Sequence, residues 1–175
     1  MTFVVALVGA CNLSAQAPKI TEYQVKAAYL ANFGRFVEWP TSVAVAKSES
    51  FNICVLGQDP FGPALDVTLA GEMIGNQKVA AKRISTPGES LDCRILFISS
   101  SEAKRLNKII DALDNSAVLT VSDIPQFSRH RGMIQLVLEG NRIRFEVNLT
   151  AAQRAGLTLS SELLKLANPV RRDRD

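Results

Sequence analysis

Three short runs of apolar residues, at 51–56, 94–98 and 117–121, are separated by segments with helical periodicity. Such runs lack the polar alternation of a half-exposed strand, so we expect strands that are buried on both faces. Strands that alternate with helices are typical of a largely parallel sheet. The pattern therefore predicts an α/β fold with a mixed, mostly parallel sheet flanked by helices.

The pattern changes near the C-terminal end of the chain. Segments 133–139 and 142–148 flank Gly140-Asn141, a pair typical of a two-residue hairpin turn. In the second segment polar residues alternate with apolar ones, which predicts an antiparallel hairpin with one face in water. With 175 residues, the chain is long enough for one domain of ordinary size.

Capping signals predict where the helices begin. Thr21 and Gln24 form a capping box, and the helix that starts there is expected to run to about Glu38, because Pro40 prevents continuation. The other helices are predicted after these signals: Asp59-Pro60 for a helix through Leu69, Ser99 with Glu102, Thr150 with Gln153, and the segment 161–167.

The first predicted helix, 22–38, carries more apolar surface than contact with one sheet face requires. Its large side chains, together with Tyr23 and Leu30, spread over more than half of the helix circumference. Some of them are expected to meet a partner or a second subunit, although the loop 41–50 could instead fold back and cover them. The candidate partner-binding residues are Tyr29, Phe33, Phe36 and Trp39.

The first residues, 1–17, contain no charge and are predicted to be an export signal. Phe3 to Ala10 form a short apolar region, and Ala15-Gln16-Ala17 has the form of a cleavage site. One alternative is a lipoprotein signal that ends before Cys11, which would anchor the protein to lipid, and another is a buried N-terminal helix. The expected organisation is a signal at 1–17, one domain at 20–170 and a charged tail at 171–175.

Two cysteines remain if Cys11 belongs to the signal. Cys54 lies in the run 51–56, and Cys93 directly precedes the run 94–98. Strands joined through a crossover are commonly neighbours, so we expect the two thiols to form a disulfide in an oxidising compartment. The alternative is a pair of reduced core cysteines.

Composition and motifs argue against catalysis and nucleic-acid binding. The 20 Lys and Arg against 17 Asp and Glu give a net charge of only +3, scattered along the chain. The one histidine, His130, stands between two arginines and is expected to be solvated. No nucleotide-binding or metal-ligand motif occurs, so we predict a protein that is not an enzyme and has no cofactor or metal.

The ends of two predicted strands provide an alternative site. Asp59, Ser99 and Ser100 follow strands and open helices, where backbone N–H groups can hold a small anion at the carboxyl edge of the sheet. Ordinary helix capping explains the same residues. A small-ligand site therefore stays an alternative to protein binding.

Seven stretches, in order along the chain, carry a resemblance to a known family. They are the segment from Tyr23 to Pro40 and the stretches 53–62, 93–102, 118–123, 132–134, 142–149 and 163–167. Together they resemble the YfiR family of periplasmic regulators, and the first is similar to the opening signature of that family. The Cys54 and Cys93 pair matches a bond between neighbouring strands in the family, whereas a second pair that some relatives carry around Gly132 is missing here.

The resemblance implies a non-enzymatic periplasmic protein that binds and inhibits the periplasmic sensor portion of an inner-membrane diguanylate cyclase. Cyclic di-GMP and biofilm formation would then fall. It further implies an outer-membrane lipoprotein as a second partner, and a homodimer. The alternative function is a periplasmic small-ligand sensor that signals to another membrane protein.

Overall fold

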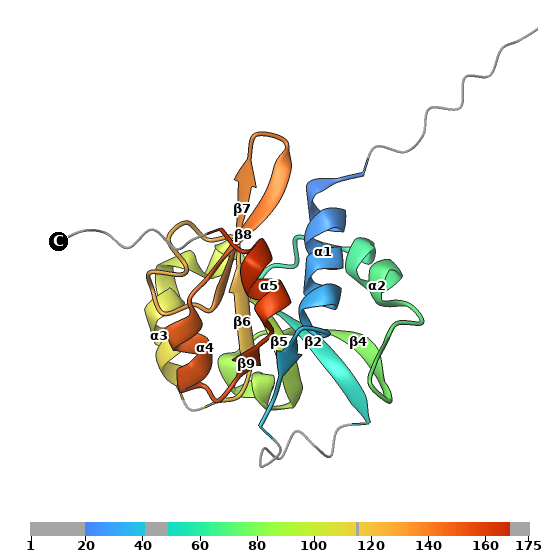
Figure 1. Cartoon of the computed structure of the whole chain (residues 1–175), viewed down its shortest axis with the longest axis horizontal. Helices are drawn as coiled ribbons and strands as arrows, with labels where there is room; N and C mark the ends of the chain where they lie inside the picture. The colour runs from blue at the N-terminus through green and yellow to red at the C-terminus, as the bar shows by residue number, and fades with distance from the viewer. Residues whose placement is uncertain (1–19, 41–48, 115, 169–175) are drawn as a thin grey trace, which may run out of the picture.

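The computed structural model describes residues 20–40, 49–114 and 116–168. Within them, seven strands form one mixed sheet in the order β3-β4-β2-β5-β6-β7-β8, and β1 and β9 form a small second sheet. Helices cover this sheet, as Figure 1 shows, so the predicted α/β class is confirmed. The expected signal at 1–17 and the tail at 171–175 lie outside the described residues.

The strands and helices have the following bounds. The strands are β1 Val37–Glu38, β2 Ser50–Leu56, β3 Met73–Ile74, β4 Gln77–Ile84, β5 Cys93–Ile98, β6 Leu119–Ser122, β7 Ile134–Glu139, β8 Arg142–Val147 and β9 Thr158–Leu159. The α-helices are α1 Glu22–Phe33, α2 Pro63–Leu69, α3 Leu106–Ala112, α4 Leu149–Arg154 and α5 Ser161–Leu166. Two 3₁₀ segments, Pro87–Asp92 and Ser100–Arg105, precede β5 and α3.

The centre of the sheet is parallel and its β8 end is antiparallel. β2 pairs in parallel with both β4 and β5, and β5, β6 and β7 continue the parallel arrangement. β7 and β8 form the predicted hairpin, with Glu139 opposite Arg142 at its turn. The change from parallel to antiparallel pairing therefore falls where the sequence pattern changes.

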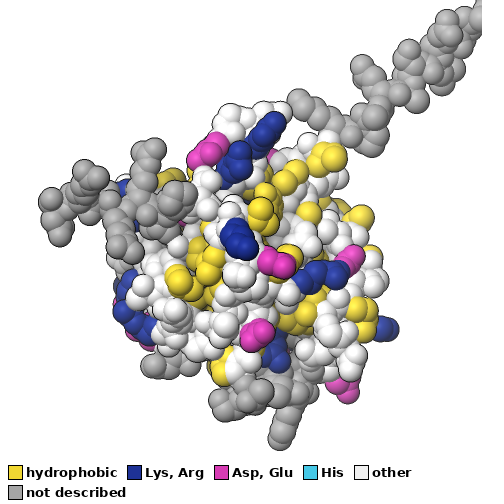
Figure 2. All heavy atoms as spheres, viewed as in Figure 1, with side chains coloured by type: hydrophobic (Ala, Val, Ile, Leu, Met, Phe, Trp, Pro, Cys, Tyr) yellow, Lys and Arg dark blue, Asp and Glu magenta, His cyan; other side chains and the backbone are white. Residues whose placement is uncertain are grey.

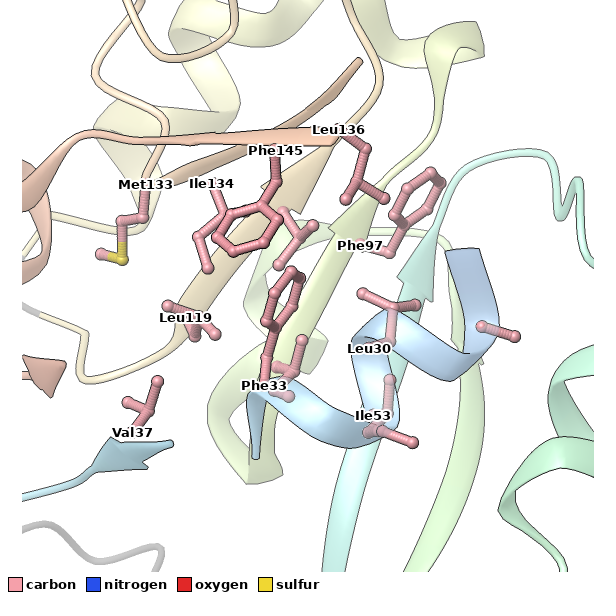
Figure 3. Close-up of a cluster of buried hydrophobic side chains, with 14 of the residues drawn as sticks. Leu30, Phe33, Val37, Ile53, Phe97, Leu119, Met133, Ile134, Leu136 and Phe145 are labelled. Atoms are coloured by element: carbon pink, nitrogen blue, oxygen red, sulfur yellow. The ribbon is translucent and has the colours of Figure 1, made fainter. Parts of the chain in front are cut away.

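The core has two layers because each central strand buries both faces. Ile53 and Val55 of β2 belong to one apolar cluster, whereas Cys54 and Leu56 belong to the other. The first cluster packs against α1, α2, α4 and α5, and the second against α3. Figure 3 shows the first cluster, in which Phe33 of α1 reaches up to Phe145 of β8.

The first helix is shorter than predicted. α1 begins with the expected Thr21–Gln24 capping box but ends at Phe33, so the boundary at Glu38 was wrong. A Cβ on Gly34 would come within 2.4 Å of the Ile74 side chain, which shows how closely the chain packs there. Beyond this point the backbone turns and becomes β1, which pairs with β9.

Three other capping predictions also need correction. α2 begins at Pro63 with Gly62 as its N-cap, not after Asp59. Asn148, not Thr150, caps α4 by accepting a hydrogen bond from the backbone N–H of Ala151 at 3.0 Å. Ser99 caps the 3₁₀ segment that leads to α3, without a capping box. A side chain caps α4 and the 3₁₀ segment, whereas α2 begins at a glycine without a side-chain cap.

Candidate functional site

The two cysteines form a disulfide between β2 and β5. The Cα atoms of Cys54 and Cys93 are 5.9 Å apart, and both side chains are fully buried. The bond lies within the apolar cluster that packs against α3. The predicted pairing is confirmed. Because the disulfide is buried, it is part of the core and not of a surface site.

Two of the four candidate partner-binding aromatics connect α1 to the hairpin. Phe33 is only 1% exposed, and its ring centroid is 5.3 Å from that of Phe145. Tyr29 packs on the same two rings, and its hydroxyl donates a hydrogen bond to the carbonyl of Ile143 at 3.1 Å. Phe33 is therefore a core residue in this conformation, whereas half-buried Tyr29 borders the surface.

The other two candidates, Phe36 and Trp39, lie beyond the end of α1. The carbonyl of Phe36 accepts a hydrogen bond from the backbone N–H of Ser160 at 2.9 Å. Trp39 meets Phe51 edge-on at 5.3 Å, and the Arg94 guanidinium lies 5.8 Å from the centre of its ring. Because these residues are not helical, the expectation that they extend an apolar helix face does not hold.

Trp39 borders a cavity of about 440 Å³ at the beginning of the central strands. Its indole N–H is buried and makes no hydrogen bond within the described part of the chain. Burial lowers the pKa of Arg94, which lines the same cavity. Residues 41–48 lie outside the described residues, so the alternative that this loop covers the aromatic surface stays a prediction.

A groove of about 590 Å³ separates α1 from the hairpin. Its apolar lining includes Ile20, which is 72% exposed, while Leu138 at the hairpin is 54% exposed. Arg142 and Arg144 line the same groove and are exposed, and neither forms an ion pair with any residue described. Figure 2 shows charged side chains at the hairpin tip and apolar ones between it and α1.

β8 is an edge strand, but its outer carbonyls are used. The Tyr29 hydroxyl binds the carbonyl of Ile143, and the backbone N–H of Asn168 donates to the carbonyl of Phe145 at 2.8 Å. These contacts protect the edge from pairing with another strand. A partner in the groove would therefore bind mainly through side chains.

The candidate ligand residues at the strand ends contact the chain itself. The Asp59 carboxylate accepts hydrogen bonds from the backbone N–H of Phe61 at 2.8 Å and from Nε of Arg83 at 2.9 Å. The Ser99 hydroxyl accepts from the backbone N–H of Ser101, whereas Ser100 is exposed. The ligand hypothesis at this edge stays a prediction that these contacts do not favour.

The crevice between the ends of β2 and β5 is filled by side chains. A Cβ on Gly57, which has a φ of +90°, would lie 2.6 Å from the Glu102 carboxylate and from the Ser101 hydroxyl. The Ser101 hydroxyl accepts the backbone N–H of Gln58 at 3.0 Å, and Glu102 pairs with Arg105. Carboxylate at this position opposes the binding of an anion.

A buried lysine ties α1 to the loop after β6. Lys26 is 3% exposed, and its ammonium group lies 2.6 Å from Asp123 and 2.5 Å from Glu22. Burial alone would lower the pKa of Lys26, but the hydrogen bonds to the two carboxylates outweigh it and raise the pKa. Burial and the nearby Asp123 carboxylate raise the pKa of Tyr23, whose hydroxyl donates to Asp123 at 3.2 Å.

The segment around Gly132 is held by hydrogen bonds. Buried Ser128 donates from its backbone N–H to the Gln135 side chain at 3.2 Å, and its hydroxyl donates to Glu146 at 3.0 Å. Asn148 donates to the carbonyl of Ser128 at 2.8 Å. Polar side chains thus connect this segment to β7 and β8.

Sequence reasoning did not single out the groove residues Ile20 and Leu138. The signal for Leu138 was present, because the apolar alternation of β7 continues to within two residues of the turn at Gly140. Burial in β7 falls toward the turn, and Leu138 lies at its exposed end. The exposure of Ile20 follows from its position before the cap of α1.

Comparison with known families decides which proteins this chain is related to. A family model described as YfiR/HmsC-like matches residues 23–168, which is more than half of the chain. The chain belongs to the YfiR/HmsC-like family. The match spans all of the sheet and all five α-helices except the first residue of α1.

Membership of the YfiR/HmsC-like family supports a periplasmic regulatory role in cyclic di-GMP signalling. The family is regulatory rather than catalytic, and it points to a membrane signalling protein as the partner. In the part of the chain that the structure describes, no helix is both long and apolar enough to cross a membrane.

Proposed function

We propose that this protein inhibits an inner-membrane diguanylate cyclase by binding the periplasmic portion of that enzyme. The bound cyclase makes less cyclic di-GMP, and biofilm formation falls. Family membership supports the signalling pathway, and the groove between α1 and the hairpin supports binding through a protein surface. The observation that carries the proposal is the combination of exposed apolar and basic side chains in that groove.

The groove has the composition of a protein-binding surface. Exposed Leu138 and Ile20 offer apolar area at two sides of the groove, half-buried Tyr29 offers an aromatic ring, and Arg142 and Arg144 add positive charge. Apolar and aromatic anchors with a charged rim are typical of specific interfaces. The complementary surface on the cyclase is apolar with acidic residues at its margin.

Other parts of the regulatory scheme belong to the same proposal. An outer-membrane lipoprotein sequesters the regulator and releases the cyclase, and the regulator acts as a homodimer. Trp39 and Phe36, near the opposite end of α1, form a second candidate surface for one of these contacts. A lipid anchor at Cys11 lies outside the described residues.

Charge reversal in the groove tests the cyclase contact. We expect Leu138→Glu and Arg144→Glu each to weaken binding of the purified regulator to the cyclase's periplasmic portion by about tenfold or more, measured by calorimetry. Leu91→Glu is the matched control, because Leu91 is 73% exposed and lies outside the groove.

The proposal also predicts the cellular result. Cells that carry either groove variant should contain more cyclic di-GMP than cells that carry the Leu91→Glu control. Equal affinity of all three variants would exclude the groove, and a Trp39→Ala variant would then test the second surface. If the unchanged regulator does not bind the periplasmic portion at all, the proposed inhibition is wrong.

A further inference from the structure

A cavity of about 170 Å³ lies where α3, α4 and the beginning of β7 meet. Apolar side chains form much of its wall, among them Val118, Met133 and Ala151. Its volume is comparable to the ~150 Å³ cavity that holds benzene in other proteins. The space therefore accommodates a six-membered ring or a short aliphatic chain.

The polar residues that line this cavity are Asp114, Thr120, Arg131 and Arg154. Two of them, Thr120 and Arg154, can donate to an acceptor oxygen on the ligand. The Thr120 hydroxyl is 3% exposed and accepts a hydrogen bond from the backbone N–H of Met133 at 3.1 Å. Since its oxygen is already used as an acceptor, the hydroxyl can offer a ligand its proton. Arg154, in the last turn of α4, can only donate.

The two arginines of the cavity differ in their partners. Arg131 pairs with Asp111 and, at 3.6 Å, with Asp114, so its charge is compensated and it holds the one carboxylate that lines the described part of the cavity. Arg131 also has a φ of +66°, an unusual backbone conformation for a residue with a side chain. Arg154 forms no ion pair within residues 20–40, 49–114 and 116–168.

We propose that this cavity binds a small amphipathic carboxylate. The apolar part of the ligand occupies the space beside Val118 and Ala151, and its carboxylate pairs with Arg154. A carboxylate fits the fork of donors on a guanidinium group better than a neutral amide does. The site is separate from the groove and does not depend on the proposed binding of a cyclase.

Benzoate and benzamide provide a matched pair of probes, because they share a ring and differ in charge. We expect benzoate to bind the full-length protein about tenfold more tightly than benzamide, as measured by ¹H–¹⁵N NMR titration at constant ionic strength. The shifted resonances should include those of Val118, Thr120 and Ala151, which line the cavity.

Two variants test separately the charge of Arg154 and the volume of the cavity. Arg154→Gln should abolish the preference for benzoate, and Ala151→Leu should weaken both probes by filling the cavity. Arg154 is exposed, so its variant is expected to fold, and Arg35→Gln is the control for loss of an exposed arginine that lines neither this cavity nor the groove. The proposal is wrong if benzoate and benzamide bind equally, if neither binds at tens of millimolar, or if Arg154→Gln leaves the preference unchanged.

Discussion

The parallel centre of the sheet and its antiparallel end are built from similar apolar residues but are buried differently. β5 and β6 are covered on both faces, and Ile95, Phe97 and Leu119 have no exposed surface. In β8 each buried residue alternates with one that is exposed or half-buried, and Leu138 of β7 is 54% exposed. The centre therefore contributes mainly to stability, whereas the antiparallel end has exposed side chains that are available for binding.

The difference teaches where a regulator of this fold can meet a partner. Helices cover both faces of the centre and a disulfide joins β2 to β5, so the side chains in the middle of these strands are out of a partner's reach. The hairpin end offers an exposed apolar residue, two arginines and a groove beside α1. We therefore expect substitutions in the centre to change stability and substitutions at the hairpin to change binding.

The largest expected effect comes from truncating a central aromatic residue. Phe97→Ala removes a fully buried ring that packs against Phe61 with centroids 4.8 Å apart. It should lower the free energy of unfolding by roughly 3 to 5 kcal/mol, because transfer and cavity terms add. Urea denaturation measures the change. Leu138→Ala at the hairpin is the matched truncation and should cost under about 0.5 kcal/mol.

Removal of the disulfide tests the centre by another route. The double variant Cys54→Ala with Cys93→Ala opens a loop between residues 39 apart in the sequence. It should lower the free energy of unfolding by about 3 to 4 kcal/mol in the chain-entropy picture. Binding of the cyclase portion, measured where the variant is still folded, should not change, because both cysteines are fully buried and neither lines the groove. A loss of affinity in the folded variant would contradict the division between centre and hairpin.

The smallest effect concerns the two contacts that hold α1. Lys26→Met removes the buried ammonium group beside Asp123 and should cost about 2 kcal/mol near neutral pH. Tyr29→Phe removes one hydrogen bond to the hairpin and should cost about 1 kcal/mol. Denaturant titration of each variant gives these values.

The contribution of Lys26 to the free energy of unfolding also depends on pH. Its pKa is raised in the folded protein, so its contribution is present below the ordinary lysine pKa and is lost as the pH rises through the folded pKa. The difference in stability between the unchanged protein and Lys26→Met should therefore shrink above about pH 10. A difference that grows at high pH would show that the ion pair does not favour the charged lysine.

Local patterns were sufficient to predict the central strands, the hairpin and the disulfide. Apolar runs such as 51–56 need cover on both faces, and Gly140-Asn141 specifies a tight turn through its own backbone preferences. The pairing of Cys54 with Cys93 followed from the expectation that crossover-linked strands are neighbours. Family membership was likewise predicted from short stretches spread along the chain.

The partner surface could not be placed from the sequence in the same way. The helix prediction put Phe33 and Phe36 on one stripe of a helix that ran to about Glu38, but Phe33 is core and Phe36 lies beyond the end of α1. The groove forms because α1 packs against the hairpin. These two elements are more than a hundred residues apart in the chain, as the hydrogen bond from Tyr29 to Ile143 shows. The spacing of residues along the sequence does not indicate how closely α1 and the hairpin approach each other in space.

The sequence by itself determined the class of fold, the strands that become central, the hairpin and the disulfide, because each depends on local periodicity or on neighbouring strands. Only the tertiary structure decided that α1 stops at Phe33, since Gly34 packs closely on Ile74 and the next residues pair with β9. It also decided that Glu102 fills the crevice at the strand ends. These outcomes depend on contacts between distant segments, whose closure no local preference specifies.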